Sequence, residues 1–148
     1  MKKDFLNSIG IRKKTPEEIH FISPLVYAYI GDAIYEVYIR TYIFHRYRGN
    51  VNIMHQIATR FVKAGAQAAV VRALEDQWSE EEWGIIKRGR NQKSGSVPKN
   101  ANLSDYRYAT GFEALLGYLY LMDKHDRIEE IIKRAIEVIE GEKIHTLE

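Results

Sequence analysis

The sequence predicts an all-α fold in a single domain, and three observations support this prediction. Nearly every boundary signal along the 148 residues is of the kind that begins or ends a helix. No segment alternates between apolar and polar residues between hairpin turns, as a half-buried strand would. The length is that of about one domain, and no repeat or linker divides it. We therefore expect about seven helices in one domain over residues 1–148, with a core at about 15–140 and frayed ends.

The first two helices are predicted by residues that cap helix N-termini. The sequence Thr15-Pro16-Glu17-Glu18 is a capping box with proline at the first helical position, so a short helix begins here. Ser23-Pro24 repeats this arrangement and begins a long apolar helix that reaches about Tyr47. Apolar residues cover more than one side of this long helix, so we expect it to be buried in a core or at a dimer interface.

The middle of the chain should contain three more helices. We expect Asn52 to cap one that runs through Lys63, and Gly65 to separate it from an alanine-rich helix over Ala66–Gln77. A second capping box, Ser79–Glu82, begins the third, with its acids in the first turn, where the helix dipole favours them.

One long loop precedes the last two helices. Residues 91–103 carry a proline, a glycine, two serines and three asparagines, which is typical of a loop. Helices are expected over 105–122, with Ser104 as the cap, and over 126–140.

The composition excludes several classes of site. The chain contains no cysteine, which excludes disulfides, thiolate zinc sites, iron–sulfur clusters and a cysteine nucleophile, and suits the reducing cytosol. The five histidines lack the spacing of zinc ligands, and no phosphate-binding glycine loop or serine nucleophile motif is present. The longest uncharged run, Phe21–Gly31, has 11 residues, whereas a membrane span needs about 18. These absences indicate a cytoplasmic protein without a membrane segment.

The charge is unevenly distributed although the net charge is only +2. The stretch from 84 to 104 contains no acid but five basic residues, which are Lys87, Arg88, Arg90, Lys93 and Lys99. Such a cluster indicates a polyanionic ligand. A solvated basic surface at a helix end is the alternative.

Two carboxylates lie within the apolar helix over 24–47. Asp32 and Glu36 are one turn apart on the same face. Burying a carboxylate without a partner is costly, so each needs a cation, a donor or water. Gly31 directly precedes Asp32 and lowers helix propensity, which is understandable if another backbone or a ligand approaches closely there.

A third carboxylate occupies an equivalent place in the helix over 105–122. Glu113 lies on or near the apolar face, between Gly111 and Gly117, which again permit close approach. If the two helices meet, Asp32 and Glu113 supply two hard oxygen ligands of the kind that Mg²⁺ accepts together with water. The alternative is that the acids form salt bridges, with Arg40, Arg60 and Arg107 as candidate partners and with Arg40 placed for an i,i+4 pair with Glu36.

The two acid-bearing helices resemble the ribonuclease III family. Tyr29–Glu36, with the sequence YIGDAIYE, is similar to the family's signature helix. Gly111–Tyr120, with the sequence GFEALLGYLY, is similar to its second acidic motif, and the resemblance extends over about Ser23–Met122. It implies a helical ribonuclease III endonuclease domain that acts as a homodimer, depends on Mg²⁺ and cleaves double-stranded RNA to leave 5′-phosphates. Carried over by position, Asp32 and Glu113 match the essential catalytic and metal-binding acids, and Glu36 is a candidate supporting residue beside them.

Two departures from the family pattern refine the resemblance. Ala28 stands where the family has a glutamate, and Thr110 where it has an aspartate. The chain also has no room for a C-terminal double-stranded RNA-binding domain. Both features are found in the short branch called mini-ribonuclease III, which implies processing of the ends of 23S ribosomal RNA precursors, with ribosomal proteins as further candidate partners.

Without a separate binding domain, the catalytic domain must itself contact the RNA phosphates. The basic residues between 84 and 104 are the candidates for these contacts. Two alternatives remain at this point. One is a non-catalytic RNA-binding or ribosome-associated protein on the same fold, and the other is an all-α protein-interaction module whose acids form plain salt bridges.

Overall fold

The computed structural model describes residues 4–93, 97–145 and 147. Within these residues the fold is all-α, as predicted, and no strand is present. The elements in chain order are α1 (Asp4–Ser8), α2 (Pro16–His20), α3 (Pro24–Arg46), α4 (Val51–Val62), α5 (Ala64–Ala73), the 3₁₀ turn η1 (Glu75–Gln77), α6 (Glu80–Arg90), α7 (Leu103–Leu121) and α8 (His125–Glu140). The sequence prediction omitted the short α1. No helix in the described part of the chain is long and apolar enough to cross a membrane.

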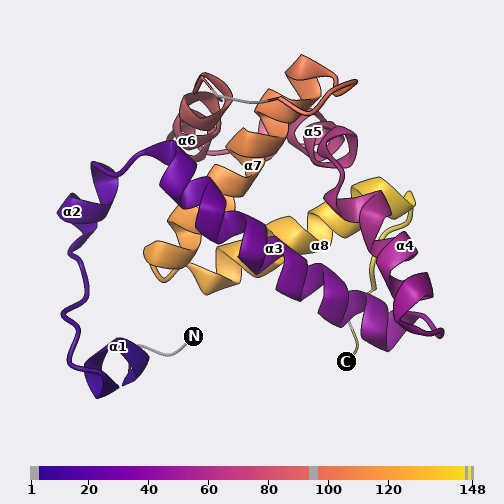
Figure 1. Ribbon diagram of the computed structural model, residues 1–148, viewed down its shortest axis with the longest axis horizontal. Coiled ribbons are helices and arrows are strands. Elements are labelled where there is room, and N and C mark those ends of the chain that lie inside the picture. Colours follow the sequence, from indigo (N-terminus) through magenta and orange to yellow (C-terminus); the bar gives the residue numbers. More distant parts are fainter. Residues whose placement is uncertain (1–3, 94–96, 146, 148) are drawn as a thin grey trace.

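Helices α3 and α7 cross at the centre of the molecule and form its most extensive contact (Figure 1). Helices α5 and α6 flank α7, and α8 packs against α5 and α7. Two glycines allow the central helices to touch through their backbones. A Cβ atom on Gly31 would lie 1.7 Å from the carbonyl oxygen of Glu113, and one on Gly117 would lie 1.8 Å from that of Tyr27. The close approach expected at Gly31 is therefore confirmed.

The core lies around the crossing of α3 and α7. Tyr27, Tyr35 and Ile39 of α3 and Phe112 of α7 are fully buried, and the Tyr35 and Phe112 rings pack edge to face with centroids 5.3 Å apart. Helix α8 closes the core with an apolar stripe of Ile128, Ile131, Ile132, Ala135 and Ile136. The core therefore holds both acid-bearing helices in place over most of their length.

Helix α4 begins earlier than predicted. Asn50 is its cap, not Asn52, because the Asn50 side chain accepts a hydrogen bond from the Ile53 backbone at 3.0 Å. The boundary with α5 falls at Lys63, not Gly65, since Lys63 takes an extended conformation that ends one helix and precedes the next.

Two further boundaries differ from the prediction. Helix α5 ends at Ala73, and only a 3₁₀ turn covers Glu75–Gln77. Helix α7 begins at Leu103 because the Asn102 side chain accepts from the Asp105 backbone at 3.0 Å, which places the cap two residues before Ser104. Asn102 and Ser104 both favour helix caps, so composition alone could not choose between them at α7.

Candidate active site

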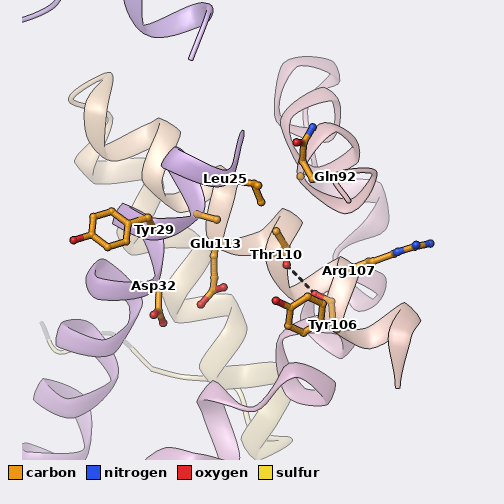
Figure 2. A pocket seen from close by; sticks show the side chains of 10 residues that line it. Leu25, Tyr29, Asp32, Gln92, Tyr106, Arg107, Thr110 and Glu113 are labelled. Atoms are coloured by element: carbon orange, nitrogen blue, oxygen red, sulfur yellow. Dashed lines mark hydrogen bonds between the residues drawn. The ribbon is translucent and has the colours of Figure 1, made fainter. Parts of the chain in front are cut away.

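Asp32 and Glu113 lie on different helices but meet in one cavity. Asp32 is exposed on α3 and the partly buried Glu113 comes from the facing side of α7, and their side chains extend in the same direction, next to each other, in the cavity (Figure 2). The backbone contact at Gly31 brings the two helices close enough for this meeting. The cavity has a volume of about 210 Å³, and its lining also includes Leu25, Ala28, Tyr29, Gly89, Gln92, Tyr106, Arg107 and Thr110.

The electrostatics of Glu113 are those of an acid without a cation. The pKa of Glu113 is raised to about 9, first by burial and then by the hydrogen bond and negative charge of Asp32. Gln67 acts in the opposite direction, and Glu36 adds a smaller increase. Among the described residues, no lysine or arginine lies within ion-pair distance of either Asp32 or Glu113.

The three arginines considered as salt-bridge partners are placed elsewhere. Arg40 donates to Glu36 at 2.9 Å, so the i,i+4 pair predicted for Glu36 is present. The Arg60 guanidinium lies 5.9 Å from the centroid of the Phe61 ring. Arg107 is exposed at the rim of the cavity, and in Figure 2 its side chain extends away from the two acids. The salt-bridge explanation therefore holds for Glu36 but not for the two acids of the cavity.

The two positions where family acids are replaced line this same cavity. Ala28 contributes no ligand, and Thr110 turns its hydroxyl back to donate to the Tyr106 carbonyl at 3.0 Å (Figure 2). In the described ranges no group of three or more histidine, cysteine or acidic side chains is arranged to hold a metal. Asp32 and Glu113 are thus the two carboxylates that could hold a cation in this cavity. A divalent cation suits them because it would relieve the repulsion between them, and Mg²⁺ accepts one or two carboxylates and keeps several waters.

Four of the five basic residues predicted to bind RNA are close in sequence to one wall of the cavity. Gly89 and Gln92, at the C-terminal end of α6 and just beyond it, line that wall. Lys87, Arg88, Lys93 and Lys99 are exposed.

Arg90 is the exception among these five basic residues, because it is half-buried. Its guanidinium lies 5.9 Å from the ring centroid of Trp83 and 5.6 Å from that of Tyr108. None of the five is within ion-pair distance of a carboxylate in the part of the chain that the structure describes. Arg90 is therefore held by aromatic rings and Arg88 donates to the Ile22 carbonyl at 3.4 Å, while the three lysines are exposed.

One polar residue next to the site was missed from the sequence. Gln67 on α5 is only 2% exposed and interacts with Glu113. The available signal was a lone amide within the small apolar stretch AGAQAAVV. A polar residue among alanines predicts a buried hydrogen bond, but nothing in the pattern names its partner.

Comparison with known proteins identifies the class of the fold and site. The family model for the ribonuclease III domain matches residues 25–124, a range that contains both Asp32 and Glu113. The chain therefore belongs to the ribonuclease III family and is an endoribonuclease.

The similar proteins place the chain in one branch of that family. The Mini-ribonuclease 3 of Clostridium tetani is 45% identical over 95% of this chain and 91% of its own length. That of Thermoanaerobacter sp. is 49% identical over 85% of this chain and 89% of its own length. A crystal structure of a Fusobacterium nucleatum protein is similar with a TM-score of 0.73 and 31% identity, and the match covers 81% of this chain and 96% of that one. Within the family, the chain is thus a member of the Mini-ribonuclease 3 group.

Proposed function

We propose that this endoribonuclease cleaves double-stranded RNA with the help of Mg²⁺ held by Asp32 and Glu113. The observation that carries the proposal is the meeting of two carboxylates, from two helices, in a cavity where neither has a cationic partner among the described residues. A protein that needed these acids only for packing would pair them with arginine or replace them. A pair of neighbouring acids without a cationic partner, which raises the pKa of Glu113, instead supports a role in holding a divalent cation.

Each residue of the cavity then has a defined task. Asp32, which is exposed, faces the solvent from which RNA approaches, and Glu113 holds the inner side of the site. Bound Mg²⁺ would polarise the phosphodiester and lower the pKa of the attacking water, which leaves a 5′-phosphate and a 3′-hydroxyl. Ala28 and Thr110 leave room on the same wall, so the RNA phosphate and water would complete the coordination that a larger acid set provides in other family members.

The basic cluster beside the cavity is suited to bind the RNA backbone. A-form RNA is recognised mainly by shape and through phosphate and 2′-hydroxyl contacts. Lys87, Arg88, Lys93 and Lys99 are exposed for such contacts, and Arg90 is oriented by its two aromatic neighbours. Affinity measured against salt for Arg88→Ala and Lys93→Ala, with uncleaved duplex in Ca²⁺, tests this role. Each lost phosphate contact should reduce the salt slope by roughly 0.7–0.9, and unchanged binding at every salt concentration would contradict it.

An exposed apolar stripe on α3 supports a homodimer. Val26, Tyr29, Ala33, Val37 and Phe44 follow a helical spacing and are all exposed, with Tyr29 at 81% and Phe44 at 65%. A second copy of the chain is the occupant we propose, since such a stripe is self-complementary across a two-fold axis.

The assembly is tested on the exposed face of α3. Val37→Asp should give a folded monomer in sedimentation experiments at micromolar concentration, whereas the parent should sediment as a dimer. Tyr27 and Tyr35 are unsuitable for this test because both are fully buried inside the protomer. A monomeric parent protein would contradict the dimer.

The natural substrate that we propose is the 23S ribosomal RNA precursor, in the cytosol, as the resemblance to the short branch of the family implies. Purified protein is incubated with a long RNA duplex and with a 23S precursor, each with Mg²⁺ and with EDTA. Cleavage in Mg²⁺ alone, with the precursor cut near the ends of the mature RNA, is the expected result. Equal cleavage in EDTA would contradict the metal site, and random cutting of the precursor would contradict the substrate.

A further inference from the structure

Tyr106, in the first turns of α7, brings a phenolic hydroxyl into the cavity of Asp32 and Glu113. Its side chain is half-buried and lines the cavity, and Figure 2 shows its hydroxyl end turned toward the side where the two carboxylates lie. The hydroxyl has no hydrogen-bond partner among the described residues, although the Tyr106 backbone carbonyl has one. It can therefore donate to a ligand that enters the cavity.

The other tyrosines show how this hydroxyl differs. Six of the ten tyrosines have a hydrogen-bond partner for their hydroxyl within the described ranges, namely Tyr27, Tyr35, Tyr38, Tyr42, Tyr47 and Tyr118. Of the remaining four, Tyr29 is 81% exposed, and the rings of Tyr108 and Tyr120 pack against arginine or histidine side chains. Tyr106 is thus the tyrosine whose unpaired hydroxyl is half-buried in the cavity of the two acids.

The wall around Tyr106 is suited to an anion. Ala28 and Thr110 carry no charge, and the Thr110 hydroxyl is already used because it donates to the Tyr106 carbonyl at 3.0 Å. In Figure 2, Tyr106 and Thr110 lie across the cavity from Asp32. A phosphate attracted to a cation on the carboxylates can therefore accept a hydrogen bond from this wall, where an acidic side chain would repel it.

We propose that the Tyr106 hydroxyl donates a hydrogen bond to a non-bridging oxygen of the RNA phosphate that is cleaved. Hydrogen bonds to charged oxygens are roughly twice as strong as those between neutral groups. A donor fixed on a long helix contributes most where negative charge develops in the transition state, so it raises kcat more than it lowers KM. Tyr106 is then a catalytic residue in addition to the two acids. This inference rests on the proposed cleavage of duplex RNA.

The first experiment compares Tyr106→Phe with the parent on a duplex RNA whose cleavage site has been mapped. Phenylalanine keeps the ring and removes only the hydroxyl, so the melting temperature and the Mn²⁺ affinity measured by electron paramagnetic resonance should equal those of the parent. In Mg²⁺, kcat should fall roughly 10- to 100-fold, the usual effect of losing a hydrogen bond to a charged group. KM for RNA should stay close to that of the parent.

Tyr120→Phe is the matched control. Tyr120 also lies on α7, is half-buried, and has no hydroxyl partner in the part of the chain that the structure describes, but it does not line the cavity. The control thus removes the same atom from the same helix at a distance from the two acids. Its kcat, KM and melting temperature should all equal those of the parent.

A second experiment identifies the atom that Tyr106 contacts. Each non-bridging oxygen of the cleaved phosphate is replaced in turn by sulfur, which is a weak hydrogen-bond acceptor. At one of the two positions, sulfur should slow the parent more than it slows Tyr106→Phe, because the variant has already lost the hydrogen bond. Such non-additivity is expected for groups in contact. Equal sulfur effects in the parent and the variant at both positions would overturn the inference.

The possible outcomes separate this inference from the proposed function. If Asp32→Asn and Glu113→Gln are inactive while Tyr106→Phe cleaves like the parent, the hydroxyl takes no part in the reaction and the inference is wrong. A fall in Mn²⁺ affinity for Tyr106→Phe would mean that the hydroxyl acts on the cation and not on the phosphate, and an equal loss of kcat in Tyr120→Phe would assign the effect to α7 as a whole. If Asp32→Asn and Glu113→Gln cleave like the parent, the proposed function itself is wrong.

Discussion

Two buried or partly buried glutamates, Glu82 and Glu113, lie on adjacent helices, but their surroundings shift their pKa values in opposite directions. Glu82 is 8% exposed and receives two hydrogen bonds from Arg127, at 2.7 and 2.9 Å, as well as one from the Ser79 backbone. Burial alone would raise the pKa of Glu82, but these hydrogen bonds outweigh it and lower the pKa. Glu113 has Asp32 for a neighbour in place of an arginine, and its pKa is raised to about 9.

The difference distinguishes an acid kept for stability from one kept for function. Glu82 caps its own helix and connects it to α8 through Arg127, so each of its interactions favours the folded protein. The pair formed by Asp32 and Glu113 opposes folding when both are charged, and a proton on Glu113 or an added cation relieves that repulsion. Replacing the glutamate by glutamine should consequently lower the stability of the protein at Glu82 but not at Glu113.

The largest effect is expected at the cavity. Asp32→Asn and Glu113→Gln should each reduce cleavage of duplex RNA by more than roughly 100-fold, since loss of a metal ligand exceeds the loss of a residue that supports one. The melting temperature in EDTA should stay the same or rise, because the variant no longer has to keep two neighbouring acids together, one of which is neutralised at a cost on folding. Cleavage rates and thermal unfolding of the same preparations check both parts. Normal activity in either variant, or unfolding of both, would contradict the site.

For Glu82→Gln we expect a loss of stability without a loss of cleavage. Glutamine keeps the capping box but removes the charge that pairs with Arg127, whose side chain is 26% exposed. The free energy of unfolding should fall by about 1–3 kcal/mol, the cost of leaving a partly buried ion pair incomplete. Cleavage by the folded protein should equal that of the parent at a temperature well below its melting point. A loss of cleavage with no loss of stability would reverse the roles of the two glutamates.

The pH dependence of stability should also differ in sign. The folded pKa of Glu113 is raised, so its contribution is complete below its ordinary value of 4.5 and is lost as pH rises toward about 9. The folded pKa of Glu82 is lowered, so its contribution is present above 4.5 and is lost as pH falls below that value. Melting temperatures in EDTA from pH 3 to 9 should show Glu113→Gln removing the loss at high pH, and Glu82→Gln removing the loss at low pH. If melting temperature changed with pH in the same way for the parent and both variants, the two glutamates would not differ as proposed.

The contrast between these glutamates also shows what sequence could predict. The fold class, the order of the main helices and the meeting of Asp32 with Glu113 followed from caps, apolar patterns and glycines, because these are local or motif-level signals. The ion pair of Glu82 with Arg127 did not, because it joins residues 45 positions apart on two helices whose relative placement no local pattern fixes. Gln67 was missed for the same reason.

Helix boundaries were predicted less well than helix identity. Asn50 and Asn52 are both good caps, and so are Asn102 and Ser104. Choosing between such neighbours depends on how the following helix packs, which is a tertiary property. The helix-end errors leave the site unaffected, since Asp32 and Glu113 lie well inside α3 and α7.

The smallest predicted effect is a change in stability at a glycine near one of the two glutamates. Gly31, which directly precedes Asp32, cannot accept a side chain because the backbone of α7 occupies that place. Gly84, two residues after Glu82 and in the interior of α6, has no atom within 4 Å of the position that a Cβ would take. Gly84→Ala should therefore raise the free energy of unfolding by about 0.4–1 kcal/mol, because alanine loses less backbone entropy on folding. Denaturant unfolding measures this gain, and cleavage should remain that of the parent. A loss of stability would mean that α6 is packed at Gly84 as closely as α3 is at Gly31, and the contrast between a crowded functional site and an open structural one would fail.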